Sequence, residues 1–119
     1  TYGVDHIEIA RILTEIGENS LVKGSLEKAS SHLQQALNIF IQRNHPEKYI
    51  PLEILAQLYA KESADATMTK KTSNISINFR RRAINYLKEA YNIVLELFPH
   101  DSPHVTRLQE KIKDLDIPK

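Results

Sequence analysis

The sequence predicts an all-α protein built from antiparallel helix hairpins, and three observations lead to this fold class. First, apolar residues recur at three- and four-residue steps in five separate segments, as at Ile9, Ile12 and Ile16, which is the spacing of an amphipathic helix. Second, no segment bounded by turn residues shows the apolar–polar alternation of a strand. Third, the pattern of the first two helices returns in the next two, which is typical of a repeated supersecondary unit.

Composition bounds the class of protein. The chain has 119 residues, of which 41% are hydrophobic and 26% charged, with a net charge of +1, as expected for one soluble globular domain. The absence of cysteine excludes a disulfide scaffold, a thiol enzyme and a cysteine-based zinc site. No stretch approaches the roughly 18 apolar residues of a membrane span, and the near-neutral charge argues against a general nucleic-acid binder.

The ends of the chain predict a piece of a longer, cytoplasmic protein. The sequence begins at Thr1 without a methionine, and helical patterning starts within a few residues. No charged segment followed by an apolar one, the mark of a secretory signal, is visible there, and the lack of cysteine suits a reducing compartment. We expect residues 1–119 to form a single domain.

The first predicted hairpin covers about residues 5–44. Asp5 is expected to cap its first helix, which ends near Asn19, and Gly24 marks the turn. Ser25 is expected to cap the second helix, which ends just before a His-Pro dipeptide.

The second predicted hairpin covers about residues 45–98. Its helices are expected at 47–62 and 77–97. The polar stretch 63–76 between them is interpreted as a tolerated surface insertion, or alternatively as a phosphorylated or partner-ordered loop. A last helix, at about 102–116, has one narrow apolar stripe and a charged opposite face, which suits the capping helix of an array.

The two hairpins share the placement of their large and small residues. The corresponding pairs are Leu13 and Leu52, Gly17 and Ala56, Ala29 and Ala83, Leu33 and Leu87, and Ala36 and Ala90. Small residues are expected where two helices come close together. One hairpin cannot bury both of its faces, so stacking of the hairpins completes the core.

This pattern resembles the tetratricopeptide repeat, and the resemblance covers about residues 4–115. The His45-Pro46 dipeptide is similar to the opening of the longer repeats found in kinesin light chains. The resemblance implies a right-handed superhelix of about two and a half repeats, whose first-type helices line a concave peptide-binding surface. Glu15 and Ile54 stand where such repeats often carry asparagine. The residues that clamp a carboxylate in chaperone-binding members are also replaced, so that function is not expected.

The resemblance implies which side chains face the concave groove. They are Arg11, Thr14, Glu15, Glu18, Ile50, Glu53, Ile54, Gln57 and Arg107. The carboxylates among them predict attraction for a basic partner, and Ile50 and Ile54 predict an apolar spot beside them. The alternative interpretation of the same pattern is an ordinary solvated helix face.

A cationic cluster precedes and begins the fourth predicted helix. It consists of Lys70, Lys71, Arg80, Arg81 and Arg82. Because cations in the first turn of a helix oppose its macrodipole, there are two interpretations. Either an acidic partner compensates for the cost, or the helix begins earlier and the arginines pair with carboxylates. Phe79 is the only aromatic residue among these cations, so a stacking platform for nucleic acid is not expected.

No motif in the sequence carries catalytic chemistry. A phosphate-binding loop, a nucleophile elbow and a His-Glu-x-x-His pattern are all missing. Pro99 and Pro103 place His100 and His104 in a turn, so their four-residue spacing does not predict a metal site. We therefore expect no enzyme activity, no cofactor and no metal.

The sequence predicts a scaffold for protein–protein interaction, which binds a peptide or protein segment in its concave groove and has no small-molecule substrate. Two alternatives remain open. One is a structural or oligomerisation element, in which Ile12, Leu21 and Val22 of the N-terminal hairpin bury against another copy or an upstream domain. The other is a regulatory or targeting domain of a larger enzyme or effector.

Overall fold

The protein is all-helical, as the sequence predicts. The computed structural model describes the backbone of residues 6–68 and 73–116 and the side chains of residues 6–63 and 78–115. Within these ranges the chain forms five α-helices, one short 3-10 helix and no strand. The elements are α1 (His6–Val22), α2 (Leu26–Gln42), η1 (Pro46–Lys48), α3 (Tyr49–Met68), α4 (Ser73–Leu97) and α5 (Pro103–Asp116).

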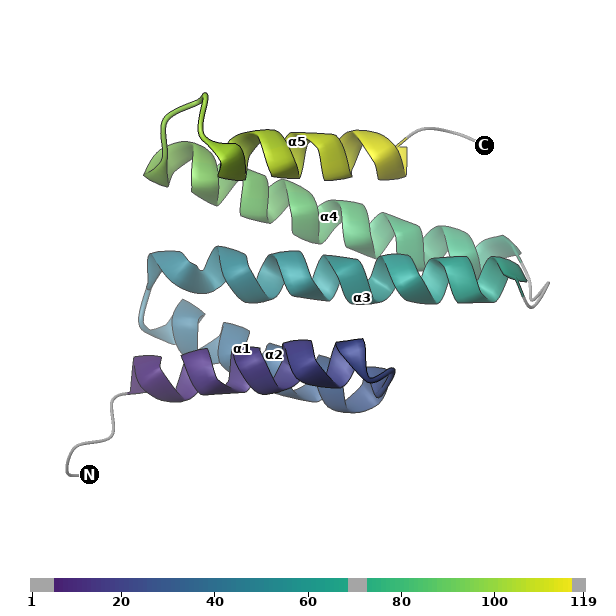
Figure 1. Ribbon diagram of the computed structural model, residues 1–119, viewed down its shortest axis with the longest axis horizontal. Coiled ribbons are helices and arrows are strands. Elements are labelled where there is room, and N and C mark those ends of the chain that lie inside the picture. Colours follow the sequence, from purple (N-terminus) through teal and green to yellow (C-terminus); the bar gives the residue numbers. More distant parts are fainter. Residues whose placement is uncertain (1–5, 69–72, 117–119) are drawn as a thin grey trace.

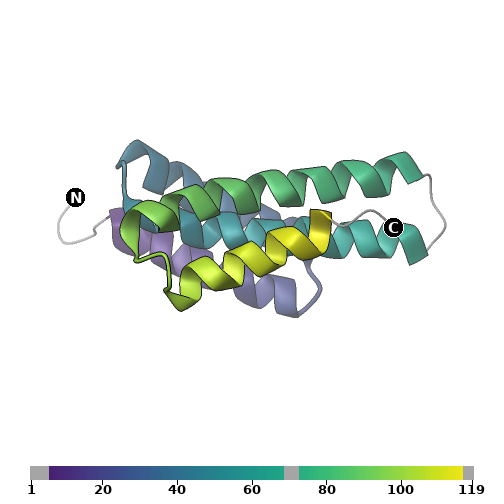
Figure 2. The same ribbon diagram turned by 90° about the horizontal axis from the view of Figure 1, so that it is seen from above.

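Successive α-helices run antiparallel and stack into an elongated body (Figure 1), whose principal extents are 51 × 34 × 21 Å. α1 pairs with α2 and α3 pairs with α4, while α2 joins the two hairpins by packing against α3. α5 runs beside the C-terminal half of α4 (Figure 2). α3 therefore lies at the centre of the stack.

The ends of α1 and α2 are closed by residues with positive φ. Gly24 follows α1 with a φ of 87°, and Asn44 follows α2 with a φ of 50°. In both turns the next N–H donates a hydrogen bond back across the helix end, as His45 does to the Phe40 carbonyl at 2.8 Å. This Schellman arrangement satisfies carbonyls that the last helical turn leaves unpaired, and glycine and asparagine tolerate the left-handed backbone that it needs.

Ser25 precedes α2 and Ser102 precedes α5, but only Ser102 makes a capping hydrogen bond with its side chain. The Ser102 hydroxyl accepts a hydrogen bond from the Val105 N–H at 3.3 Å, at the start of α5. Ser25 precedes α2, but its side chain makes no capping hydrogen bond. Its ψ of 76° lies below the extended range that aims a capping side chain at the first N–H groups of a helix.

The second hairpin opens with the His-Pro dipeptide. His45 Nδ1 accepts a hydrogen bond from the Glu47 N–H at 3.1 Å, and Pro46 takes the first position of η1, where its missing N–H costs nothing. α3 begins at Tyr49, two residues later than the predicted start at Glu47. Pro51 fits within the first turn of α3 because that turn needs no intrahelical donor there.

The polar stretch 63–76 is mostly helical, whereas helices were predicted only at 47–62 and 77–97. α3 continues to Met68 and α4 begins at Ser73, so the second hairpin extends the architecture of the first (Figure 1). Residues 69–72 lie outside the described residues. Alanine and methionine favour helix and serine and threonine oppose it only weakly, so paired helices can continue without a clear apolar stripe.

The helices enclose one continuous core and a smaller second cluster. The most deeply buried leucines of the main core are Leu33, Leu55, Leu58, Leu87 and Leu108. The second cluster lies between α1 and α2 and contains Ala10, Ala36 and Phe40. Leu21, predicted as part of a contact with another molecule, belongs to the main core and is 8% exposed.

A small residue lets the helices of the first hairpin come close, as predicted. A Cβ atom at Gly17 of α1 would lie 2.6 Å from Leu33 Cγ and 3.3 Å from the Ala29 carbonyl oxygen of α2. Neither atom can move easily, because Leu33 is fully buried and the carbonyl belongs to a helix backbone. Gly17 is therefore required for space.

We expect Gly17→Ala to destabilise the fold by about 1 kcal/mol, because the overpacking cost of about 1–3 kcal/mol exceeds the gain of about 1 kcal/mol in helix propensity. Thermal unfolding followed by circular dichroism should show a Tm about 4 °C lower. Glu18→Ala, at the exposed neighbouring position, is the control and should change Tm little. A Gly17→Ala variant as stable as the native protein would show that the spacing of α1 and α2 adjusts freely.

Candidate functional site

Six of the nine side chains predicted for the concave face line one groove between α1 and α3. They are Arg11, Thr14, Glu15, Glu18, Ile50 and Ile54. Phe40 of α2 and Glu47 of η1 complete the lining, and the cavity measures about 270 Å³. We call this cavity the α1–α3 groove. It lies where the two hairpins meet.

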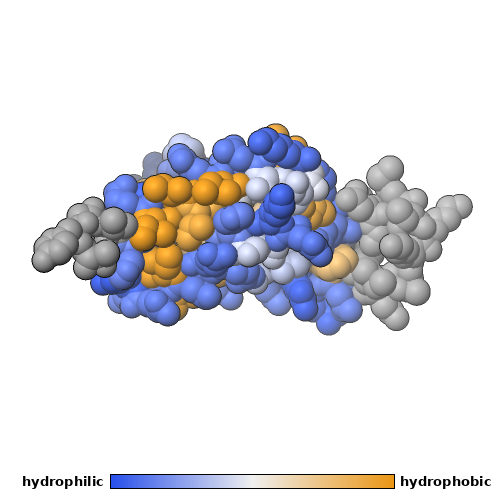
Figure 3. Space-filling view, turned by 90° about the horizontal axis from the view of Figure 1, so that it is seen from below, coloured by the Kyte–Doolittle hydropathy of each residue, from blue (hydrophilic) through white to orange (hydrophobic). Residues whose placement is uncertain are grey.

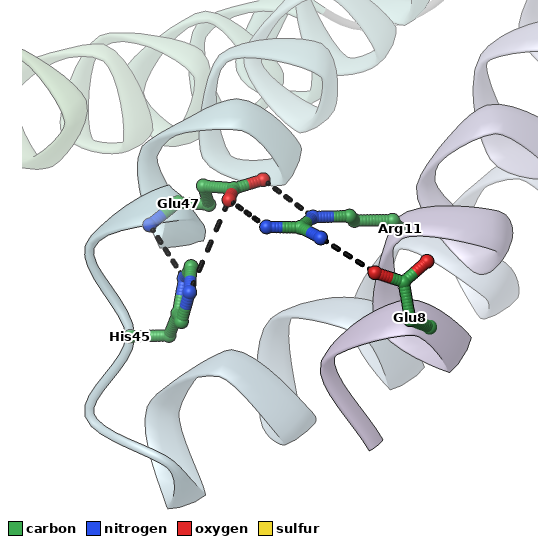
Figure 4. Close-up of polar contacts among 4 residues, drawn as sticks. All are labelled: Glu8, Arg11, His45 and Glu47. Carbon is green, nitrogen blue, oxygen red and sulfur yellow. Dashed lines mark hydrogen bonds and ion pairs between the residues drawn. The ribbon is translucent and has the colours of Figure 1, made fainter. Parts of the chain in front are cut away.

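Arg11 ties α1 to the start of the second hairpin (Figure 4). Its guanidinium donates two hydrogen bonds to Glu47, from Nε to Oε1 at 3.1 Å and from Nη2 to Oε2 at 2.5 Å. A third runs from Nη1 to Glu8 Oε1 at 2.7 Å, and His45 Nε2 lies 3.9 Å from Glu47 Oε2. The hydrogen bond from Arg11 lowers the pKa of Glu47, although burial opposes this. Arg11 therefore has carboxylate partners within its own chain.

Sequence analysis misses Phe40 and Glu47 as members of this site. Glu47 lies 36 residues from Arg11, and no periodicity relates positions that far apart. The resemblance points only to first-type helices, whereas Phe40 belongs to α2 and Glu47 to η1. The one available signal for Glu47 is its place directly after the His-Pro dipeptide, at the junction of the hairpins.

Glu15 and Glu18 contribute open negative charge to the groove. Both are exposed, and among the residues that the structure describes neither carboxylate has an ion-pair partner. Glu8 and Glu47 add two carboxylates around the single guanidinium of Arg11. Three acidic groups and one basic group therefore line the groove, so its formal charge is negative and attracts cations.

Two groove residues are more buried than a solvent-facing prediction implies. Thr14 is 7% exposed, and its hydroxyl donates a hydrogen bond to the Ala10 carbonyl at 2.8 Å. Ile54 is 5% exposed and belongs to the main core. Both shape the groove wall, while the half-buried Ile50 keeps apolar surface open to a ligand.

Glu53 and Arg107, both predicted for the concave face, bind each other. Arg107 donates from Nε to Glu53 Oε2 at 2.8 Å and from Nη2 to Oε1 at 2.9 Å. Lys111 Nζ donates to Oε2 at 2.7 Å. The Glu53 residue is only 8% exposed, so its carboxylate joins α3 to α5 and is not open to a partner.

The electrostatics of Glu53 are set by two opposing effects. Burial alone would raise the pKa of Glu53, but hydrogen bonds from Arg107 and Lys111 outweigh it, and the net pKa lies below the ordinary value. The hydrogen bond to Glu53 also raises the pKa of Arg107. Both groups are therefore ionised at neutral pH, in a setting where loss of one partner leaves a buried charge uncompensated.

Gln57, the remaining predicted residue, is exposed and lines a second opening, between α3 and α5. The other lining residues of this opening are Ala56, Ala60, Leu87, Lys111, Asp114 and Leu115. We call it the α3–α5 pocket. The predicted concave residues are thus divided between two openings, and the Glu53–Arg107 ion pair belongs to neither.

The three arginines of the cationic cluster lie within α4 and not at its start. Because α4 begins at Ser73, Arg80–Arg82 occupy its third turn, and the predicted conflict with the helix macrodipole does not arise. The Arg82 guanidinium lies 5.6 Å from the centroid of the Tyr59 ring, which is a cation–π contact. The remaining members, Lys70 and Lys71, lie outside the described residues.

Tyr59 makes aromatic contacts that sequence analysis does not foresee. Its ring stacks with Phe79 and Tyr86 of α4, at centroid distances of 6.2 and 5.6 Å. Gln34 Nε2 of α2 donates a hydrogen bond to the Tyr86 hydroxyl at 3.2 Å. These rings join three helices of the fold, so their stacking surface is used internally.

His104 takes part in contacts around the start of α5. Its ring centroid lies 4.5 Å from that of Phe98 and 6.3 Å from that of Tyr49, and its Nδ1 lies 3.1 Å from Arg107 Nη1. His100 is exposed. In the described part of the chain, no three potential histidine, cysteine or acidic ligands gather as a metal site would need, and no helix is long and apolar enough to cross a membrane.

Comparison with known proteins found no match: no family model, no curated protein and no solved structure is detectably similar to this chain. The resemblance to the tetratricopeptide repeat therefore rests on the residues of the sequence.

We expect Glu53→Gln to lower the free energy of unfolding by about 2–3 kcal/mol near neutral pH, because it removes the carboxylate from a buried ion pair. The cations left behind, Arg107 and Lys111, are partly solvated. The folded-state pKa of Glu53 is lowered from 4.5. Its contribution is therefore fully present above that value and is lost as the pH falls through the lowered pKa. Urea denaturation at several pH values measures the free energy of unfolding of the variant and of the native protein. The difference between these two free energies should become smaller in acid.

Glu110→Gln, at an exposed position of α5, is the matched control and should stay within about 0.5 kcal/mol of the native protein. A difference for Glu53→Gln that is constant from neutral to acid pH would show that Glu53 contributes through packing and not through its charge.

Proposed function

We propose that this chain is a helical-repeat interaction module of the tetratricopeptide type, which holds a basic segment of a partner protein in the α1–α3 groove. The observation that carries the proposal is the convergence of six residues, expected on a concave face from sequence alone, on one groove between the hairpins. Helical spacing places four of them on one face of α1 and the other two on one face of α3, but it does not require these two faces to meet.

The chemistry of the groove favours this kind of ligand. The open carboxylates of Glu15 and Glu18 attract lysine or arginine, and the half-buried Ile50 offers apolar surface to the aliphatic part of such side chains. Its volume of about 270 Å³ lies below the roughly 300–1,000 Å³ of typical small-molecule sites. A partner side chain suits it better than a free metabolite.

The repeat interpretation has support from packing within the first hairpin. Gly17 lies against Leu33 and Ala29, which are the small and large positions that the repeat pattern pairs. Ala83 and Leu87, their counterparts in the second hairpin, are likewise buried in the main core. We propose on this basis that the stack is a right-handed superhelix of about two and a half repeats, which acts as a non-enzymatic cytoplasmic scaffold.

Affinity capture from the source-cell lysate tests the groove. The native domain should retain a partner that Glu15→Lys/Glu18→Lys loses, since reversal of both charges repels a basic segment. Glu53 must not be altered in this test because it is buried in an ion pair. Circular dichroism should show equal helicity for every form.

The matched control is Glu27→Lys/Glu89→Lys, which makes the same charge change at two exposed positions outside the groove. It should capture the partner as well as the native domain does. Equal capture by all three forms would contradict the proposal and direct attention to Arg80–Arg82 or to the opposite face.

A second candidate function, self-association through the first hairpin, is favoured by one observation. Ile12 and Ile16 of α1 are 54% and 40% exposed. Each lies two positions from Thr14, and therefore about 200° around the helix, on the side of α1 away from the groove. Figure 3 views the molecule from the side of the first hairpin and shows a continuous apolar area toward the end that carries the N-terminus. Such an area on a soluble protein often marks an interface, and we take a second copy as its occupant.

Analytical ultracentrifugation tests self-association. The native domain should gain mass with concentration, and Ile12→Lys/Ile16→Lys should remain monomeric because two charges cannot be buried in an apolar interface. Ile41→Lys, at a residue of α2 with 55% exposure, should behave like the native protein. A native domain that stays monomeric at all concentrations would eliminate this candidate.

A further inference from the structure

The α3–α5 pocket has the shape of a site for one apolar side chain. Leu87 is 2% exposed and forms its base, while Ala56, Ala60 and Leu115 form its walls. Its volume is about 200 Å³, too small for a typical metabolite site. The Lys111 ammonium on its edge is held by Glu53 at 2.7 Å, so the edge presents little open positive charge.

The pocket and the α1–α3 groove are built in the same way. The groove has walls from α1 and α3 with Phe40 of the intervening α2 at its base. The pocket has walls from α3 and α5 with Leu87 of the intervening α4 at its base. Because odd-numbered helices form the walls and an even-numbered helix forms the base in both cases, the two openings lie on the same side of the stack. One bound chain can reach both.

Both openings border α3. Ile50 and Ile54 line the groove, and Ala56, Gln57 and Ala60 line the pocket, so the openings lie on different flanks of one helix and a ligand that enters both must cross it. Because this helix separates the two openings, the fold sets the number of ligand residues between the two anchors.

From this geometry we infer that the chain recognises a two-part motif, in which a basic residue sits over Glu15 and Glu18 and an aliphatic residue at a fixed spacing along the same segment enters the α3–α5 pocket. The inference rests on the proposed function, since it takes the occupant of the groove to be a basic segment. Glu53 carries one negative charge and binds both Arg107 and Lys111, so this cluster has a net charge of +1 and suits the aliphatic anchor better than the basic one. The acidic groove fixes the charge of the ligand, and the pocket fixes the position of its leucine, isoleucine or methionine.

Fluorescence anisotropy with synthetic peptides tests the motif. The probes are fluorescein-labelled peptides of glycine and serine with two adjacent arginines and one leucine, placed one to six positions apart in either order. Binding to the native domain should be tightest at one spacing and in one of the two orders. Replacement of that leucine by serine should weaken binding about tenfold, the factor expected from burial of one aliphatic side chain.

Two variants separate the anchors. Ala60→Leu fills the pocket and should abolish the preference for leucine, while binding that depends on arginine remains. Lys88→Leu adds the same side chain at an exposed position of α4 outside both openings and should change nothing. The leucine-to-serine peptide keeps the test valid if Ala60→Leu fails to fold, because it leaves the protein unchanged.

The outcomes distinguish the motif from the function on which it rests. Arginine-dependent binding that is lost in Glu15→Lys/Glu18→Lys, but is indifferent to leucine and its spacing, would overturn the two-part motif and leave the proposed groove in place. No arginine-dependent binding to the native domain would overturn both.

Discussion

Much of this structure depends on one electrostatic constraint, the compensation of the carboxylate of Glu53 within the central helix. The six residues from Pro51 to Ala56 are all buried, so α3 must be covered on nearly every side, and Glu53 brings a negative charge into that environment. Burial of an unpaired carboxylate would cost several kcal/mol. Arg107 and Lys111 remove this penalty only if α5 lies where it does. The position of α5 in turn creates the wall of the α3–α5 pocket.

A weaker pair has the corresponding role at the other side of α3. Arg11 connects α1 to Glu47 of η1, but the side chains of Arg11 and Glu47 are 45% and 28% exposed, where water competes for both charges. We infer that the packing of Gly17 against Leu33 contributes more to the position of α1 than this ion pair does. Arg11 is the cation that lines the groove, and Glu47 compensates its charge. Glu15 and Glu18 therefore determine the charge that a ligand meets.

Several features follow from residue spacing, and several do not. The five helices, the turn at Gly24 and the close contact at Gly17 are local or repeat-based, so periodicity predicts them. The helical extensions into residues 63–76 were missed because paired helices need no continuous apolar stripe. Glu53 and Leu21 were expected at the surface, yet both are buried. A helical wheel shows which residues share a face, but it does not show how completely another helix covers that face.

The sequence by itself determined the helical class and the two hairpins, because these depend on period, turn residues and the alternation of large and small side chains, and the repeat resemblance named six of the residues that line the groove. Only the tertiary structure decided which charges are open and which are neutralised. Glu15 and Glu53 look alike in the sequence, as acidic residues on first-type helices. One faces an open groove, and the other lies 2.8 Å from an arginine that is 54 residues away. Ion pairs over such separations arise from the docking of whole helices, and no local pattern records them.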